Sequence, residues 1–532
     1  MRLVPLLLLS ASLALGQVAS GSIEGQIKDE SGGGLAGARV AARQENTGFT
    51  RTAVSDDAGA YHIEQVTPGT YSIEVQRDGF RPAVASHVTV EVQQQATLDF
   101  SLKVGAAHDS VEVKARISPL QTRDSAVGYR VDSDTVTQLP LDERNMIALV
   151  TLGPGAIPRQ LGGFTHDVDN DVQQGTRGSV ALNPPINGSR PSMNSFLLDG
   201  AYDTDRNAFA IVVTPPMEAV QEFRLQSSMA PAAFSQSGGG VMDVITKSGG
   251  REFHGNVFEY FRNEITDARN YFEDPSLPRP IFRRNQYGGS LGGRLPVPST
   301  FFFVTYEGLR SKSAAPSLQL VPGMAMRGGD FSQGNTIYDP LSASTAAGRS
   351  PFPGHVIPAD RIDPIARAYL TRFEPLPNSP NNPSSNYVDP GASTSNHDEV
   401  STRIDHQFAN GGLLFGRYTL NDESGGIGGN FPLRPTSEQL RAQQAVLGHT
   451  IGGASWSNEL RASFARLRLL DVPINAGGAN IAEQLGILNP PTDPSTFGLP
   501  YFFLTDFSTV TDDPTLPQIQ RDNTWGLKAI VV

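Results

Sequence analysis

Apolar and polar residues alternate with a period of two over short segments in the first hundred residues of the chain. Along Tyr71–Val75 every second side chain is apolar, which is typical of a strand with one buried face. Clusters of turn residues, such as Ser31–Gly34 and Thr67–Gly69, separate segments of this kind. Their number and spacing within 21–104 predict a β-sandwich. The expected strands are Gly21–Lys28, Ala38–Arg43, Phe49–Val54, Tyr61–Gln65, Tyr71–Arg77, Val84–Val92 and Ala96–Lys103.

A second region, 251–532, carries longer segments with strand character. Six of these segments have 10 to 13 residues and Leu413–Leu420 has 8, close to the length that a tilted transmembrane β-strand needs, and a further strand begins at Asn523–Val532. Two long connections, 310–398 and 469–522, alternate with short ones, as in outer-membrane barrels. The longer segments are Glu252–Arg262, Arg284–Leu295, Thr300–Leu309, Glu399–Phe408, Leu413–Leu420, Arg441–Ile451 and Trp456–Arg468.

Aromatic residues are concentrated in the same region. The first 250 residues contain 12 Phe, Tyr and Trp residues, whereas the remaining 282 contain 30. Aromatic rings prefer the boundary between lipid and water, so this enrichment favours a membrane barrel. The strand pattern by itself also fits a water-soluble all-β domain with inserted loops. Pattern and composition therefore predict a mainly β chain and leave both environments open for its second half.

The N-terminus has the layout of an export signal. Arg2 precedes an almost wholly apolar run, Leu3–Leu15, and small residues before Gln17 offer a cleavage site, so 1–16 is expected to be a secretory signal peptide. A membrane anchor needs about 20 apolar residues, and this run of about 13 is too short. We therefore expect a mature chain that is exported and is soluble, secreted or a β-barrel.

Composition removes several classes of function. The 532 residues include no Cys, which excludes disulfide scaffolds, thiolate metal sites and a Cys nucleophile. The net charge of −12 argues against nucleic-acid binding through phosphate contacts. Ser290 has the G-x-S-x-G spacing of a hydrolase elbow, but the glycines around it alternate within an expected strand, where an elbow needs a strand–turn–helix. We therefore expect no enzyme activity and no cofactor.

Two groups of aspartates have a spacing that suggests calcium. Asp167, Asp169 and Asp171 begin like an EF-hand loop, but the sixth and twelfth positions lack the Gly and Glu that such a loop requires. Solvated carboxylates in turns are the ordinary interpretation of such groups, so we expect no metal site. The second group is Asp199, Asp203 and Asp205.

The expected sandwich resembles the carboxypeptidase regulatory-like domain. The resemblance rests on GQIKD at 25–29, LAGARV at 35–40, DAGAY at 57–61 and PGTY at 68–71. It implies a binding or stability module without peptidase activity. Starch-binding relatives within that superfamily extend the expectation to weak carbohydrate binding.

Linked motifs across 139–310 resemble the Oar-like group of TonB-dependent outer-membrane receptors. In chain order they are LPLDERN at 139–145, NSFLLDG at 194–200, PMEAVQEF at 216–223, VITKSGG at 244–250 and FFF at 301–303. The resemblance implies an α+β plug domain over 119–250, with a glycine hinge at its end, followed by an antiparallel outer-membrane β-barrel over 251–532. Before the plug, it implies a linker over 105–118.

The linker contains a segment that resembles a TonB box, the strand that an energised periplasmic partner captures by β-augmentation. An ordinary connector strand fits these residues equally well. The resemblance implies three partners: the periplasmic domain of TonB with its inner-membrane energising complex, outer-membrane lipid, and an oligosaccharide or peptide ligand. The TonB-box-like residues are Asp109, Ser110, Val111, Glu112, Val113, Lys114 and Ala115.

The expected barrel is incomplete. Transporters of this class have 22 strands around a plug, and at about 10 residues per strand the 282 residues after Gly250 do not supply them together with such long loops. We therefore expect an N-terminal fragment of a receptor for energised uptake, located in the cell outer membrane. The alternative is an envelope adhesion or signalling protein that binds glycan or protein through the sandwich without transport.

Overall fold

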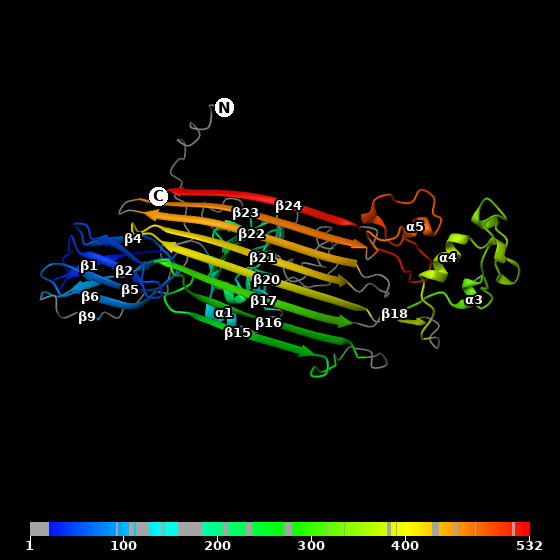
Figure 1. Ribbon diagram of the computed structural model, residues 1–532, viewed down its shortest axis with the longest axis horizontal. Coiled ribbons are helices and arrows are strands. Elements are labelled where there is room, and N and C mark those ends of the chain that lie inside the picture. The colour runs from blue at the N-terminus through cyan, green and yellow to red at the C-terminus, as the bar shows by residue number, and fades with distance from the viewer. Residues whose placement is uncertain are drawn as a thin grey trace, which may run out of the picture.

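The computed structural model is built mainly of β-strands: a sandwich lies at one end, a long sheet that covers a smaller sheet lies in the middle, and a loop-based unit lies at the other end (Figure 1). None of the helices that it describes is long and apolar enough to cross a membrane. The described residues are 21–91, 94–105, 111–112, 127–139, 141, 144–157, 184–205, 211–229, 237–269, 271, 279–314, 317–334, 336–379, 385–389, 391–427, 436–452, 456–473, 475–512 and 516–531.

The N-terminal part is a β-sandwich, as the alternating pattern predicts. One sheet has the order β4-β1-β7 with β8 also on β1, and the other has the order β3-β2-β5-β6-β9. Their inward side chains, such as Ile27, Tyr71 and Ile73, are fully buried between the sheets. The strands are β1 (Gly21–Asp29), β2 (Arg39–Gln44), β3 (Thr50–Val54), β4 (Ala60–Val66), β5 (Gly69–Gln76), β6 (Ala83–Val90), β7 (Gln95–Thr97), β8 (Phe100–Leu102) and β9 (Val111–Glu112).

The middle part is a five-stranded sheet, here called the inner sheet, with the order β10-β13-β14-β11-β12. Strands β13 and β14 have almost every residue buried, because both faces of the sheet are covered. Its elements are β10 (Val127–Asp132), α1 (Ser133–Gln138), the 3₁₀ helix η2 (Met146–Leu152), η3 (Pro191–Met193), β11 (Ser195–Leu198), β12 (Ala201–Tyr202), η4 (Met217–Ala219), β13 (Val220–Ser228) and β14 (Val241–Thr246).

The third part is a long, curved, eight-stranded sheet, here called the wall. Its strands are antiparallel and neighbours in chain order, which is the up-and-down arrangement of a barrel. The sheet is barrel-like but not closed: β15 and β24 form its two edges in the described chain. The strands are β15 (His254–Asn263), β16 (Ile281–Arg294), β17 (Thr300–Ala314), β20 (Ala392–Gln407), β21 (Leu413–Ile427), β22 (Thr436–Gly452), β23 (Ser457–Pro473) and β24 (Gln518–Val531).

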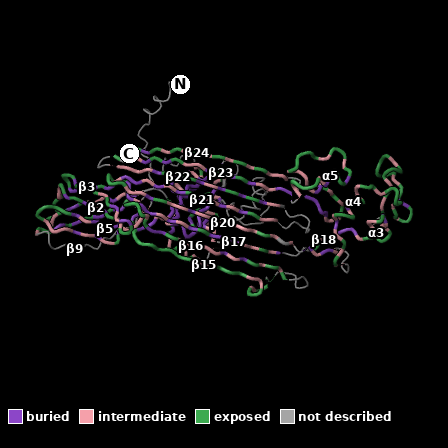
Figure 2. Tube along the Cα trace, in the orientation of Figure 1, coloured by how far each residue is buried: buried purple, intermediate pink, exposed green. Residues whose placement is uncertain are grey.

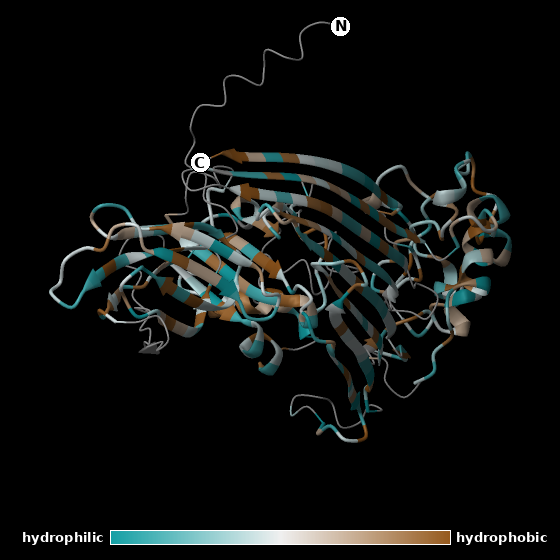
Figure 3. Ribbon diagram, turned by 60° about the vertical axis from the view of Figure 1, so that its left-hand side comes forward, coloured by the Kyte–Doolittle hydropathy of each residue, from teal (hydrophilic) through white to brown (hydrophobic). Residues whose placement is uncertain are grey.

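Over part of its length the wall has an inverted pattern of polarity. Along β24, Trp525 and Leu527 are 79% and 78% exposed, whereas the polar Gln520 and Thr524 point to the half-buried inner face. Strand β21 likewise turns the buried Arg417 inward and the exposed Tyr418 outward. Apolar side chains on the outside and polar ones on the inside are the arrangement of a sheet that faces lipid. Figure 3 shows brown and teal bands alternating along these curved strands.

The two long connections of the wall fold against each other into a compact outer unit, at the opposite end of the molecule from the sandwich (Figure 1). Tyr369 lies at its centre, 1% exposed, with its ring centroid 4.1 Å from that of Phe502 and its hydroxyl 2.7 Å from Val510 O. The elements of the unit are β18 (Ser317–Gln319), α3 (Met324–Arg327), η6 (Ala346–Gly348), η7 (Pro353–His355), η8 (Ala359–Arg361), α4 (Pro364–Arg372), β19 (Tyr387–Asp389), α5 (Ile481–Gln484) and η9 (Pro494–Thr496).

The structure differs from the sequence-based expectation in three elements. The sequence predicts a short helix over Leu141–Val150 that ends before Gly153, and the structure has a 3₁₀ helix over Met146–Leu152 there; α1 was not among the expected elements. The last wall strand begins at Gln518 instead of Asn523. The wall strands also run further toward the outer unit than the polarity pattern predicts, as in β20, which starts at Ala392.

Candidate functional site: the junction between the inner sheet and the wall

A tight turn between β11 and β12 brings an aspartate to the wall. Asp199 and Gly200 have φ values of 50° and 69°, the left-handed pair that a two-residue β-hairpin turn requires. The Asp199 carboxylate accepts hydrogen bonds from Thr246 N and Thr246 Oγ1, each at 2.9 Å. These bonds fix the carboxylate to the end of β14.

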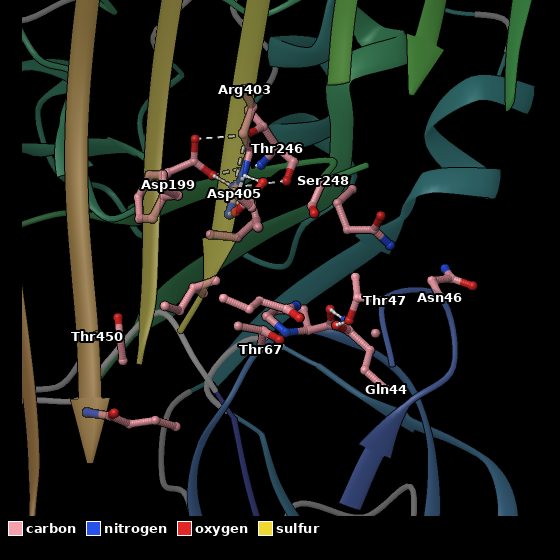
Figure 4. Close-up of a pocket in the computed structure, with 18 of the residues that line it drawn as sticks. Gln44, Asn46, Thr47, Thr67, Asp199, Thr246, Ser248, Arg403, Asp405 and Thr450 are labelled. Atoms are coloured by element: carbon pink, nitrogen blue, oxygen red, sulfur yellow. Dashed lines mark hydrogen bonds and ion pairs between the residues drawn. The ribbon is translucent and has the colours of Figure 1, made fainter. Parts of the chain in front are cut away.

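Two arginines of the wall close on this carboxylate. Arg403 Nη1 of β20 lies 3.0 Å from Asp199 Oδ1, and Arg417 Nε of β21 lies 2.7 Å from Asp199 Oδ2. Arg403 also forms an ion pair of 2.9 Å with Asp405 on its own strand. Figure 4 shows Arg403 between the Asp199 and Asp405 side chains. We call Asp199, Arg403, Asp405 and Arg417 the aspartate cluster.

Burial and charge act in opposite directions on the carboxylates of the inner sheet. Burial tends to raise the pKa of Asp199, but the two arginines and the Thr246 hydrogen bonds outweigh it and lower that pKa. At Asp203, burial dominates over the attraction of Arg417 and raises the pKa well above the usual value. Asp199 is therefore held as an anion in a buried site, where an ion pair is costly to break by removing one partner.

Amide side chains of the wall add hydrogen bonds near the aspartate cluster. Asn421 of β21 accepts a bond of 3.0 Å from Thr214 N and donates one of 2.9 Å to Thr214 O, as a neighbouring strand would. Gln444 of β22 donates to Tyr202 O and to Asp203 Oδ1, both at 3.1 Å. These bonds satisfy backbone groups of the inner sheet that would otherwise be buried without a partner.

A second ionic contact fastens the inner sheet to the first wall strands. Arg144 Nη2 donates to Glu218 Oε1 at 2.9 Å, and Arg144 Nε lies 3.3 Å from Glu307 Oε1 of β17. The guanidinium carbon also lies 4.4 Å from the centre of the Phe258 ring and 5.1 Å from that of Tyr260, both on β15. We call this the arginine contact.

Apolar packing fills the space between these polar contacts. Phe223 and Leu225 of β13 share one buried cluster with Leu440 of β22 and Leu467 of β23. Figure 2 shows the buried residues concentrated where the wall covers the inner sheet. The inner sheet is therefore held against the wall by apolar packing and by discrete buried ion pairs.

The structure places the sequence-predicted residues in different surroundings. Val111–Glu112 form β9, which pairs in parallel with Ala83–Val84 of β6, while Asp109, Ser110, Val113, Lys114 and Ala115 lie outside the described residues. Ser290 stands inside β16 with its hydroxyl 2.6 Å from Asn256 Oδ1, so the strand–turn–helix of a hydrolase elbow is missing there.

The structure describes one of the two aspartate groups considered for calcium. Asp199 is engaged by the two arginines, and among the described residues no group of three or more acidic or histidine side chains is arranged to hold a metal ion. The other group, at 167–171, lies outside the described residues.

Sequence reasoning did not find the partners of Asp199 and Arg144. Asp199 and Arg403 stand 204 residues apart, and nothing in the local pattern links them. The available signals were the motifs themselves, because LPLDERN contains Arg144 and NSFLLDG contains Asp199.

Comparison with known proteins decides the family. A model of the outer membrane beta barrel domain matches residues 245–532, which is more than half of the chain. The chain belongs to this outer-membrane barrel family. A model of the carboxypeptidase regulatory-like domain matches residues 22–103, within the sandwich. Membership of the barrel family places the chain in the outer membrane and agrees with the inverted polarity of the wall.

Relatives of this barrel protein include one curated transporter. The TonB-dependent transporter Oar from Myxococcus xanthus is 25% identical over 277 residues, which cover 50% of this chain and 24% of that protein. The chain thus spans about a quarter of the length of this relative. It resembles the TonB-dependent, Oar-like receptors, as its motifs suggest.

Solved structures of receptors are also similar to the chain. The siderophore receptor PirA from Acinetobacter baumannii has 15% identity and a TM-score of 0.39, with coverage of 65% of this chain and 40% of that one. A mutant of the ferric enterobactin receptor PfeA from Pseudomonas aeruginosa has 12% identity and a TM-score of 0.42, with coverage of 76% and 46%.

Proposed function

We propose that the chain acts in a TonB-dependent outer-membrane receptor that takes up its ligand when an energised partner moves the inner sheet. The observation that carries the proposal is the inner sheet on the concave side of the wall, fastened by the aspartate cluster and the arginine contact. In this role the inner sheet is the plug. The similarity to the transporter Oar supports the same assignment.

The contacts of the inner sheet suit a plug that moves only when work is done on it. An ion pair at this junction separates only if water or another partner reaches both charges, because a charge left buried without a partner costs about 3–5 kcal/mol. Thermal motion therefore opens such a junction rarely, whereas a directed pull can break the contacts one after another. A resting plug of this kind keeps the lumen closed.

We assign the parts of the chain to successive tasks. Residues 1–16 serve as the export signal, 21–104 as a periplasmic sandwich, 105–118 as the linker that TonB captures, 119–250 as the plug and 251–532 as part of the barrel. The extended backbone of β9 supports the assignment of the linker, because β-augmentation needs a segment that can pair as a strand. The outer unit would meet the ligand first, since it lies farthest from the sandwich (Figure 1).

Copurification with the periplasmic domain of TonB tests the proposal. Changing both Val111 and Val113 to Pro removes two backbone N–H donors and is expected to abolish capture. The matched control changes the same two residues to Ala, which keeps the donors and should keep most of the binding.

The two variants distinguish backbone pairing from other contacts. Full capture of the proline variant would contradict strand capture at this segment. Absence of capture by the unaltered chain would contradict TonB dependence and favour a binding protein of the envelope that does not transport.

A further inference from the structure

The sandwich meets the inner sheet and the wall along one polar seam. A cavity of about 170 Å³ lies there, with walls from all three parts. Figure 4 shows Gln44, Thr47 and Thr67 of the sandwich on one side of this space, and Asp199 and Arg403 on the other. Contacts between domains that are polar, instead of large and apolar, are typical of interfaces that allow relative motion.

One contact at the seam is made to the covalent junction between the inner sheet and the wall. Residues 247–253 connect β14 to β15, and Arg251 lies within them. Arg251 N donates to Asn46 O and Arg251 Nε donates to Thr47 O, both at 3.0 Å. Asn46 and Thr47 belong to the loop between β2 and β3 of the sandwich.

A glycine leaves room for the Arg251 side chain at this contact. Gly48 has a φ of 72°, and a Cβ atom there would lie 1.6 Å from Arg251 Nη2. Any side chain at this position would therefore push the arginine away. We call Asn46, Thr47, Gly48 and Arg251 the clasp.

The sandwich also contacts the other end of the inner sheet. Glu91, directly after β6, forms an ion pair with Arg130 of β10, the first strand of the inner sheet. The segment between the sandwich and β10 contains β9, whose two residues pair with β6. The sandwich thus contacts the inner sheet at its first strand and the chain directly after its last one.

The sandwich, as docked on the inner sheet and the wall, contains a buried polar group without hydrogen bonds to the part of the chain that the structure describes. Gln65 is 2% exposed and borders the cavity, yet neither its Oε1 nor its Nε2 has a hydrogen-bond partner among the described residues. Its φ of 55° is also unusual for a residue other than glycine. A buried amide without partners weakens the docked state, which suits a contact that has to be released.

We propose that the sandwich is a detachable partner of the inner sheet: it holds the sheet closed through the clasp and the Glu91–Arg130 pair, and it has to leave before the sheet moves. The inference rests on the proposed function, because only a mobile inner sheet needs such a restraint. These contacts join the sandwich, which precedes the segment before β10 in the chain, to Arg130 and Arg251, which follow it. They therefore resist a pull on that segment at first.

An engineered disulfide tests the docking. A Cβ at Gly250 would lie 3.8 Å from Asn46 Cβ, which matches the mean separation in disulfides, and apart from its two chain neighbours the nearest atom is Asn46 O at 3.4 Å. Because the chain has no Cys, the double variant Asn46→Cys/Gly250→Cys offers a single intramolecular pair. We expect nearly complete cross-linking in the full chain under oxidising conditions and none within either single variant. Absence of the cross-link would overturn the docked arrangement.

Hydrogen exchange tests the restraint itself. The amides of β10 and β14 in the full chain, embedded in lipid, should exchange roughly tenfold faster after Arg251→Ala, as expected at the low end for the loss of one hydrogen bond from a charged donor. The oxidised double-cysteine variant should exchange more slowly than its reduced form. The matched control is Arg43→Ala, an exposed arginine of β2 outside the clasp, which should leave exchange unchanged.

The outcomes separate this inference from the proposed function. Unchanged exchange in both the Arg251 variant and the oxidised double-cysteine variant would overturn the restraint. Neither measurement involves TonB, so the restraint can fail while capture by TonB stands. If the proline variant is no longer captured by TonB, the cross-linking and exchange results at the clasp still stand.

Discussion

Replacing Asp199 by Asn is expected to loosen the inner sheet from the wall. The carboxylate is 3% exposed and lies 3.0 Å from Arg403 Nη1 and 2.7 Å from Arg417 Nε. Asparagine keeps the shape of the side chain but removes the charge. Arg417, whose side chain is fully buried, then loses this carboxylate.

The expected loss is about 3 kcal/mol. Removing one partner of a buried ion pair costs about 3–5 kcal/mol, and the lower end applies because Arg403 keeps its pair with Asp405 at 2.9 Å. Since each 1.4 kcal/mol is a factor of ten, this loss should speed the exchange of the β11 and β14 amides by roughly 100-fold.

The matched control is Asp422→Asn, which lies on β21 like Arg417. Asp422 forms an ion pair with Arg441, but both side chains are exposed, so its loss should cost less than about 1 kcal/mol. Mass spectrometry of exchange in lipid bilayers measures both variants. Equal effects of the two substitutions, or less than a tenfold change for Asp199→Asn, would refute the assignment of the aspartate cluster as a main fastening.

Three further predictions concern other buried polar groups. Arg144→Met should lower protection over η2 by about 3 kcal/mol, because Glu218 and Glu307 lose the charge between them; exchange measures this, and an unchanged rate would contradict it. Burial raises the pKa of Asp243 from 3.8 to about 6, against the pull of Arg461 and Lys528, so the native state binds more protons than the unfolded state between these values and loses stability as the pH rises from about 4 to about 6. Asp243→Asn should abolish that fall and gain up to roughly 3 kcal/mol at pH 7 in denaturant titrations, whereas a loss of stability would show that the carboxylate is needed as an anion. Tyr369→Phe should destabilise the outer unit by about 1–3 kcal/mol, because Val510 O and Glu374 Oε2 lose the hydroxyl at 2.7 and 2.8 Å; faster proteolysis of that unit alone checks it, and an unchanged half-life would contradict it.

The sequence predicted well those elements whose pattern is set locally. In the sandwich, alternating side chains along Tyr71–Val75 mark one buried face, and β5 carries that pattern over Gly69–Gln76. The wall strands were found for the same reason, because the lipid and the inner sheet impose different polarity on their two faces.

The missed parts lacked such a local signal. After Ala392, the first residues of β20, from Ser393 to Asp398, are polar on both faces, so this part of the strand shows no alternation. The aspartate cluster joins Asp199 to side chains more than 200 positions away. Its geometry follows from how the inner sheet packs against the wall. A short stretch of sequence carries no information on that packing.

If the outer face of the wall lies in lipid, Trp525 lies there too, and its fluorescence tests that placement most directly. The chain has two Trp residues, so Trp456→Phe leaves Trp525, 79% exposed on β24, as the only reporter. In bilayers with brominated acyl chains, we predict strong quenching of its fluorescence and little quenching by aqueous iodide. Strong quenching by iodide without an effect of the brominated lipid would contradict a wall embedded in the membrane.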